Sequence, residues 1–110
     1  MAEKIRVLSK RPGQPPRSVW MSNSLENFQT AVGGYIETVT LAEDLVIICN
    51  EEGRLKGMPY NCTICGVSFV GDIILAGVKG EEFSDLPLDY GEMKKIFGWL
   101  WPGKDKEETQ

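Results

Sequence analysis

The strongest constraint on the fold is a run of five apolar residues, L-V-I-I-C at 45–49. Successive side chains of a β-strand point to opposite faces of the sheet, so a strand with this sequence has no polar face to turn toward water. The run therefore predicts a central strand. A second apolar segment, D-I-I-L-A-G-V-K at 72–79, predicts a further strand.

The N-terminal part of the chain predicts a β-hairpin. K-I-R-V-L-S-K at 4–10 alternates, with Ile5 and Val7 on one face, which is typical of a half-buried strand. R-P-G-Q-P-P at 11–16 is a turn cluster, and R-S-V-W-M-S at 17–22 is extended again. These segments predict two strands joined by a stiff basic loop.

Two strands are expected on either side of the central run. Y-I-E-T-V-T-L at 35–41 predicts one, with Tyr35, Glu37, Val39 and Leu41 on one face. N-E-E-G at 50–53 predicts a type I turn in which Gly53 supplies a positive φ, and the chain then returns as a shorter strand at 54–57.

A short helix is expected after the hairpin. Asn23 followed by Glu26 resembles a capping box with the asparagine in the cap position. Gly33 and Gly34 end the helix, where a left-handed cap is needed. The apolar stripe of this helix consists of Leu25, Phe28 and Val32.

A second helix is expected to close the chain. Pro87 and Asp89 open it, and Pro102–Gly103 stops it. Its buried stripe consists of Met93, Ile96, Phe97 and Leu100. Trp99 and Trp101 flank this stripe, so we expect an indole to face outward and to form an interface in a homo-oligomer.

These elements together predict an α+β fold. We expect a single domain at residues 1–103, built on a mostly antiparallel sheet of about five to six strands with two helices. One helix is short and follows the first hairpin, and the other is C-terminal. Residues 104–110, K-D-K-E-E-T-Q, are expected to form a solvated tail.

Charge is distributed unevenly along the 110 residues. The net charge is -4, but residues 1–17 carry +4 and the remainder therefore -8. An acidic bulk surface repels phosphate chains, so binding to long nucleic acids is not expected, whereas a local basic loop can still hold a small anion. No apolar run reaches the length of a membrane span and no signal peptide is evident, so we expect a cytoplasmic protein that does not bind membranes.

Three segments form a distinctive set: V-G-G-Y-I-E (32–37), I-C-N-E-E-G-R-L-K-G-M-P-Y-N (48–61) and G-D-I-I-L-A-G (71–77). With them, residues 4–100 resemble domain-of-unknown-function family 3846, small proteins of Firmicutes, their phages and mobile elements. The resemblance implies a standalone accessory protein of phage or mobile-element type and no particular reaction. The stretch between Asn61 and Gly71 departs from the family pattern, because it is short and carries cysteines.

The motif C-T-I-C-G at 62–66 raises the question of a metal or redox site. A structural zinc site needs four ligands, and this chain has no histidine and one further cysteine, Cys49, in a strand expected to be buried. A fourth ligand would be a carboxylate such as Asp72 or would come from another subunit. A redox dithiol normally opens a helix, whereas this motif is expected in a loop. We therefore expect structural cysteines, no metal and no cofactor; zinc shared between chains and redox chemistry stay open as alternatives.

Catalysis has little support in the sequence. Without histidine, acid–base chemistry would fall to carboxylates, lysine or tyrosine. No nucleophile elbow around a serine and no phosphate-binding P-loop is present. We therefore expect no catalytic residues.

The basic residues suggest a ligand site. Lys10, Arg11 and Arg17 lie around one predicted hairpin loop, and Arg54 and Lys56 lie on another. If both loops lie at one end of the sheet, the guanidinium groups can clamp phosphates. The alternative is a solvated basic face without a ligand.

Other polar and aromatic residues complete the predicted ligand site. Glu37 lies at the edge of the predicted core, and its alternative role is to face solvent or to bond Arg54 or Arg17. Asn50 and Asn61 flank the central hairpin, and their alternative role is turn and strand-end bonding. The aromatic residues that could stack a base are Trp20, Tyr35 and Tyr60.

These observations favour a non-catalytic binding protein. Such a protein would sequester a small anionic, nucleotide-like host signal or block a host defence protein. A structural or regulatory module that acts through protein contacts, without a small ligand, is the first alternative. A zinc-stabilised domain is the second.

Overall fold

The computed structural model describes residues 3–101. Its strands are β1 (Lys4–Lys10), β2 (Arg17–Ser22), β3 (Ile36–Ala42), β4 (Leu45–Asn50), β5 (Tyr60–Ile64), β6 (Val67–Val70), β7 (Ile73–Lys79) and β8 (Glu82–Ser84). Its helices are α1 (Leu25–Val32), α2 (Tyr90–Ile96) and the 3-10 turn η1 (Gly98–Leu100). The predictions for Pro102–Gly103 and for the tail at 104–110 lie outside the described residues.

Six strands form one antiparallel sheet in the order β2-β1-β7-β4-β3, with β8 paired to the end of β7. The apolar strands β4 and β7 are neighbours in its middle, with Ile47 opposite Leu75. β5 and β6 form a separate two-stranded sheet. The prediction of an α+β fold with a mostly antiparallel sheet and two helices is confirmed, and so is the central position of residues 45–49.

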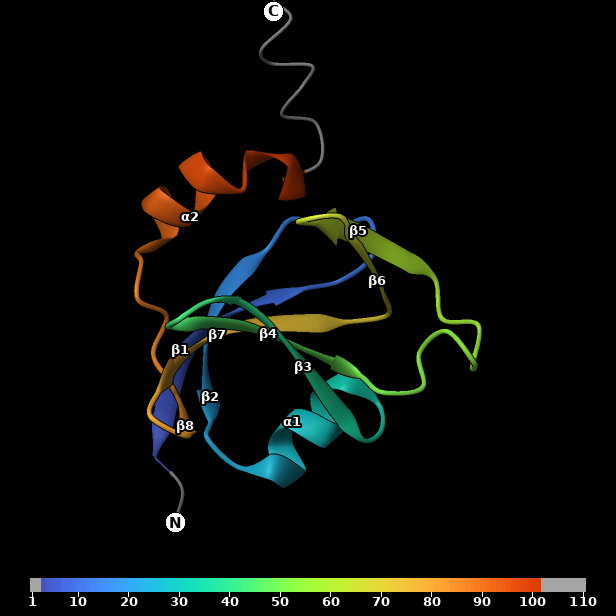
Figure 1. Ribbon diagram of the computed structural model, residues 1–110, viewed down its shortest axis with the longest axis horizontal. Coiled ribbons are helices and arrows are strands. Elements are labelled where there is room, and N and C mark those ends of the chain that lie inside the picture. The colour runs from blue at the N-terminus through green and yellow to red at the C-terminus, as the bar shows by residue number, and fades with distance from the viewer. Residues whose placement is uncertain (1–2, 102–110) are drawn as a thin grey trace, which may run out of the picture.

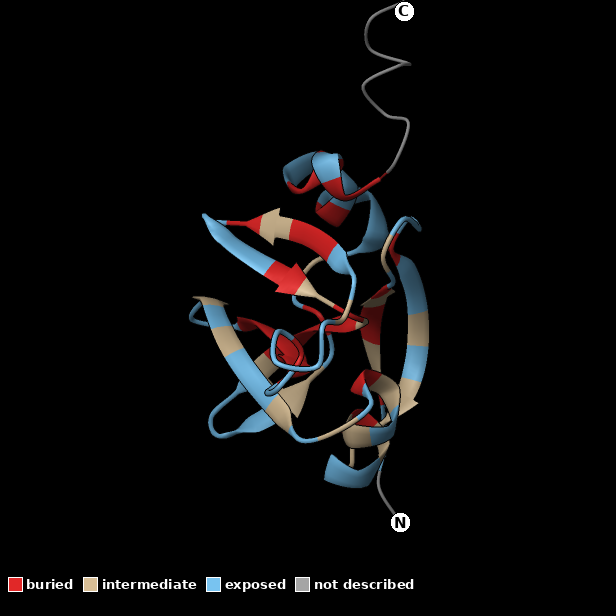
Figure 2. Cartoon of the chain, turned by 90° about the vertical axis from the view of Figure 1, so that its right-hand side faces the viewer, coloured by how far each residue is buried: buried red, intermediate tan, exposed pale blue. Residues whose placement is uncertain are grey.

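Layers cover both faces of the sheet. Figure 1 shows α1 on one side, and α2 with the β5–β6 hairpin on the other. Ile48 and Ile74 pack with Phe28 of α1, whereas Ile47 and Leu75 point the other way into the second core. Figure 2 shows buried residues concentrated in the inner elements and exposed residues along the outer strands. Strands β4 and β7 are therefore buried on both faces, as their sequences require.

Helix α1 begins one residue later than the sequence suggests. Its N-cap is Ser24, whose side chain accepts a hydrogen bond from the Asn27 backbone. The prediction of an Asn23 cap is wrong, because the Asn23 amide instead donates to the Phe83 carbonyl oxygen and ties α1 to β8. Gly33 closes the helix at φ 82°, as predicted. Phe28 and Val32 are buried, but Leu25 in the first turn is exposed.

The closing helix α2 begins as predicted and ends earlier. Asp89 caps it in a full capping box with Glu92. Of the predicted stripe, Met93, Phe97 and Leu100 are buried, but Ile96 is 52% exposed. The chain leaves the α-helix after Ile96 and tightens into η1, which changes the angle between successive side chains. The prediction of Ile96 in the buried stripe is therefore wrong: Met93 and Phe97, four residues apart, occupy the buried face, and Ile96 lies beside that face.

The segment after β4 is a series of turns, so the prediction of a strand at 54–57 is wrong. The backbone N–H of Lys56 donates to the Glu52 carbonyl, and that of Gly57 donates to the Arg54 carbonyl. The positive φ of this loop, 68°, occurs at Gly57 and not at Gly53. Gly53 is required for a different reason, because a Cβ atom there would lie 2.9 Å from a methyl group of Val70.

A β5–β6 hairpin, which the sequence patterns did not predict, takes the place of the expected cysteine loop. Cys65 and Gly66 form its two-residue turn, with φ 51° and 78°. A turn with two positive φ values matches the right-handed twist of the strands that it joins. Cysteine is an unusual residue at the first of these positions, so the turn gave no clear signal.

No helix among residues 3–101 is long and apolar enough to cross a membrane.

We predict that Gly53→Ala lowers the free energy of unfolding by about 1–3 kcal/mol, because the new methyl group overpacks against Val70. In a Val70→Ala background the same change should cost much less, since the obstructing methyl group is gone. Urea denaturation of the four proteins measures both costs. Equal costs in the two backgrounds would show that the contact with Val70 is not the reason for a glycine here.

Candidate functional site

A groove of about 1150 Å³ opens between β2, the β1–β2 loop and helix α1. Residues 58–59 and 71–72, which flank the β5–β6 hairpin, complete its wall. Arg17 and Val19 lie two residues apart on β2, so their side chains are on the same face of the sheet. This is the α1 side, where Val19 packs against the core. The groove therefore lies on the α1 side, and the first basic loop forms one of its walls.

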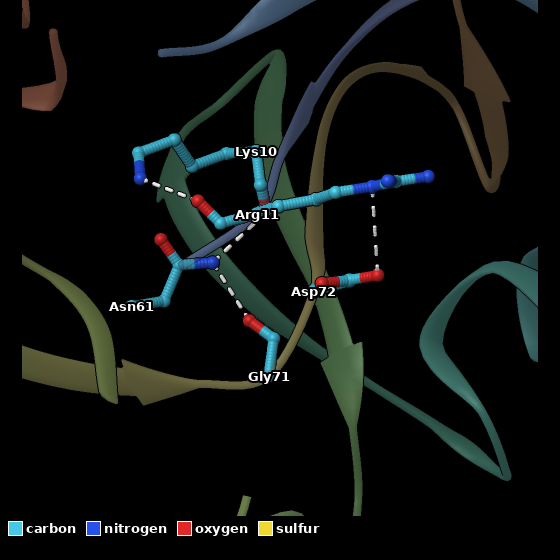
Figure 3. A network of polar contacts seen from close by, with 5 residues as sticks. All are labelled: Lys10, Arg11, Asn61, Gly71 and Asp72. Carbon is cyan, nitrogen blue, oxygen red and sulfur yellow. Dashed lines mark hydrogen bonds and ion pairs between the residues drawn. The ribbon is translucent and has the colours of Figure 1, made fainter. Parts of the chain in front are cut away.

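Two arginines and one carboxylate line this groove. Arg11 and Arg17 come from opposite ends of the β1–β2 loop, and Asp72 comes from the start of β7. The Arg11 Nε atom lies 3.9 Å from the Asp72 Oδ2 atom, and both side chains are well exposed (Figure 3). Arg17 has no carboxylate partner within residues 3–101. The groove thus offers two guanidinium groups to an anion.

Asn61 links the two backbone segments that carry Arg11 and Asp72. Its Nδ2 atom donates to the Lys10 carbonyl oxygen at 2.9 Å and to the Gly71 carbonyl oxygen at 2.7 Å (Figure 3). The residues that follow these two carbonyls are Arg11 and Asp72. Asn61 is buried, and its Oδ1 atom has no hydrogen-bond partner among the described residues. The alternative structural role of Asn61 is therefore the one that the geometry favours.

Lys10 does not reach the groove. Figure 3 shows its side chain leaving the end of β1 in the direction opposite to Arg11. It is 3% exposed, and its Nζ atom donates to the Arg11 carbonyl oxygen at 2.8 Å. Burial lowers the pKa of Lys10, an effect that the nearby Cys62 partly offsets. The structure therefore does not bring Lys10 together with Arg11 and Arg17 in the groove, because alternation along β1 turns it into the core.

Arg54 lies in a second, smaller cleft of about 280 Å³, which also includes Glu37 and Asn50. This cleft shares no lining residue with the groove. Arg54 donates to the Ser68 carbonyl oxygen at 2.6 Å and so ties the loop to β6. The structure therefore does not bring the two basic loops together in one groove.

The polar residues of the second cleft have structural partners or face solvent. Asn50 donates to the Val32 carbonyl oxygen and accepts from the Glu52 backbone, which is the turn-bonding alternative. Glu37 is exposed on the edge strand β3. Burial raises the pKa of the neighbouring Cys49 to about 11; the Glu37 carboxylate adds to this shift, and Arg54 opposes it.

None of the three aromatic residues has a position that commits it to stacking in the groove. Tyr35 precedes β3 and is exposed, and Tyr60 shares a hydrogen bond with Thr63. Trp20 borders the groove, but it lies opposite Arg6 on the face that points away from α1. The same alternation applies to Lys4, which also borders the groove. Arg11 and Arg17 are therefore the groove residues best placed to contact a ligand.

The two C-terminal tryptophans differ. Trp101 is 7% exposed, packs edge-on against Tyr90 and donates to its hydroxyl group, so its indole is not at the surface of the chain. Trp99 is 56% exposed, although its Nε1 atom donates to the Thr63 carbonyl oxygen. Trp99 is therefore the tryptophan that keeps the predicted outward position.

The cysteines occupy unlike environments. Cys49 and Cys62 are buried, whereas Cys65 is exposed at the hairpin turn. Burial raises the pKa of Cys62, and the nearby Lys10 partly opposes this. Within residues 3–101, no group of three or more histidine, cysteine or acidic side chains is placed to hold a metal ion.

Asp72 lines the groove but was not among the predicted ligand-binding residues. The sequence suggested it only as a possible zinc ligand. Its position depends on Gly71, whose φ of 72° turns the chain into β7. A glycine followed by an aspartate at the start of an apolar strand gives a weak signal for such a turn, and nothing in the sequence connects it to Arg11.

The family model described as Domain of unknown function (DUF3846) matches residues 5–98. The chain belongs to this family. Searches of curated proteins and of solved structures found no match. The conclusions about the groove therefore depend on its own geometry.

We predict that Lys10→Met raises the free energy of unfolding at pH 7 by about 1 kcal/mol, because it replaces a buried ammonium group, which has no carboxylate partner among residues 3–101, by an apolar side chain of similar length. The pKa of Lys10 is lowered in the folded state from its ordinary 10.5, so the folded protein loses this proton first as the pH rises. The wild type gains stability through that window, and the advantage of the variant should shrink toward pH 10.

Urea denaturation at both pH values measures this difference. Lys79→Met, on an exposed lysine, is the matched control and should change little. A marked loss of stability in Lys10→Met at pH 7 would show that the ammonium group is needed by the fold.

Proposed function

We propose that this protein is a non-catalytic binding protein whose groove holds a small, phosphate-bearing ligand. The observation that carries the proposal is the placement of Arg11 and Arg17 on one face of one groove, with Arg17 unpaired to any described carboxylate. Guanidinium groups bind phosphate through two parallel hydrogen bonds, and they do so at any physiological pH.

The charge balance limits the size of the ligand. Residues 1–17 carry +4 and the rest of the chain carries -8. A long nucleic acid would extend over the acidic surface and be repelled, whereas a nucleotide-sized anion stays within the basic segment. A small ligand therefore fits the electrostatics better than a polymer.

The biological role that we propose rests on the resemblance noted from the sequence motifs, which implies an accessory protein of phage or mobile-element type. A small accessory protein of phage or mobile-element type, in the cytoplasm of a host, would act by sequestering a nucleotide-like host signal. As an alternative anti-defence role, it would bind and block a host defence protein.

We predict that Arg11→Ala and Arg17→Ala each weaken binding of a phosphate-bearing ligand by about 10–100-fold, the loss expected for charge-assisted hydrogen bonds. Arg54→Ala is the matched control, because Arg54 lies in the separate cleft. Both groove arginines are exposed, so the variants should stay folded. Calorimetry at low salt against linear and cyclic nucleotides provides the measurement.

Equal losses in all three variants would point to a general charge effect instead of a groove site. If the wild type shows no heat of binding with any nucleotide, the small-ligand proposal is wrong and the role through protein contacts is favoured.

A second candidate function, action through protein contacts, is favoured by the exposed apolar residues of the C-terminal segment. Ile96 and Trp99 are each more than half exposed. Large exposed aromatic residues are enriched at interfaces, and two-fold homo-oligomers are the commonest assemblies. We propose that these two residues contribute to a homo-oligomer.

We predict that Trp99→Ala and Ile96→Ser each shift the chain toward monomer, by about 2 kcal/mol for the indole. Ile96→Ser makes the test independent of the Trp99–Thr63 hydrogen bond, and Leu25→Ser, on the exposed side of α1, is the control. Sedimentation equilibrium at tens of micromolar measures the mass. A wild-type mass near the monomer value of 12.3 kDa would exclude the oligomer.

A further inference from the structure

Asp72 is an unexpected group in a groove that binds anions. Its carboxylate lies on the same wall as Arg11, at 3.9 Å from the Nε atom of that residue. The distance and the exposure of both side chains make this a weak ion pair. A bare phosphate held by Arg11 would also be repelled by Asp72, because the two negative charges would lie within the distance over which salt screens only partly.

The position of Asp72 is fixed by the fold. The Gly71 carbonyl oxygen accepts from the buried Asn61, and the Gly71 backbone N–H donates to the Pro59 carbonyl oxygen at 2.8 Å. Gly71 has a φ of 72°, and a Cβ atom there would lie 2.7 Å from the Met58 sulfur atom. The backbone at Gly71 is thus held by hydrogen bonds on both of its polar groups, and no residue with a Cβ atom fits at this position without a shift of Met58.

The spacing between the carboxylate and the arginine is fixed by the same side chain. The two carbonyl groups that Asn61 binds immediately precede Arg11 and Asp72 (Figure 3). One buried amide therefore sets a positive and a negative group side by side at the mouth of the groove. Two opposite charges that start from neighbouring, fixed points of the backbone suit a ligand that carries an anionic group and hydrogen-bond donors together.

We propose that the groove selects phosphorylated ligands that carry free hydroxyl groups, such as phosphorylated sugars and ribonucleotides. Arg11 and Arg17 bind the phosphate, and the Asp72 carboxylate accepts hydrogen bonds from the hydroxyl groups. The carboxylate rejects anions without donors, since these leave it unpaired beside a negative charge. This inference rests on the proposed function, because it assigns the ligand class of the same groove.

The experiment uses three probes: AMP, its 2′,3′-dideoxy analogue, and inorganic phosphate. AMP and the analogue have the same phosphate and base, so the ratio of their affinities reports on the hydroxyl groups alone. Calorimetry with the full chain should show AMP binding at least about tenfold more tightly than the analogue, as expected for hydrogen bonds to a charged acceptor. Phosphate should bind more weakly than AMP.

Asp72→Ala is expected to abolish the preference for AMP and to strengthen the binding of inorganic phosphate. Asp72→Asn removes the charge but keeps an acceptor, so it should retain part of the preference. Asp72 is partly exposed and makes no hydrogen bond that the fold requires in the described residues, so both variants should fold; circular dichroism checks this.

The possible outcomes separate the two proposals. If AMP and its analogue bind equally well and the Arg17→Ala variant loses both, the phosphate groove stands and the role of Asp72 is overturned. An unchanged AMP preference in Asp72→Ala also overturns the role of Asp72. If none of the three probes binds the wild type, the ligand class proposed for this groove is wrong, and the wider nucleotide panel then decides on the proposed function.

Discussion

The pairing of β4 with β7 is the constraint on which the rest of the structure depends. Both strands are apolar on both faces, so their ladder is stable only when a layer covers each side. Helix α1 covers one side, and α2 with the β5–β6 hairpin covers the other. The short elements, which are too small to be stable alone, are held by this apolar surface.

The same burial decides which polar groups reach solvent. At the end of β1, strand alternation sends Lys10 into one core and Arg11 into the groove on the opposite side. The buried amide of Asn61 then satisfies the backbone carbonyls that this crowded junction would otherwise leave without donors. The groove is therefore placed where the N-terminal hairpin, β7 and the small hairpin meet.

Electrostatics gives this junction its functional character. Residues 1–17 carry +4 and the rest of the chain carries -8, and the groove contains two guanidinium groups beside one carboxylate. The buried ionisable groups behave differently: burial disfavours the charged form of Lys10, Cys49 and Cys62, which suits structural roles in the core. The binding role that we propose concerns the exposed groups, whereas the buried groups pack in the core.

The sequence by itself determined the fold class, the central strand at 45–49 and the first hairpin, because periodicity and composition act locally. It also indicated that Arg11 and Arg17 lie around one loop. Only the tertiary structure decided that Lys10 is buried, that Arg54 belongs to another cleft, and that Asp72 stands beside Arg11. These outcomes depend on contacts between segments that are distant in the chain. The hydrogen bond from Asn61 of the β5–β6 hairpin to the Lys10 carbonyl oxygen of β1 is the main example, and no local sequence pattern specifies it.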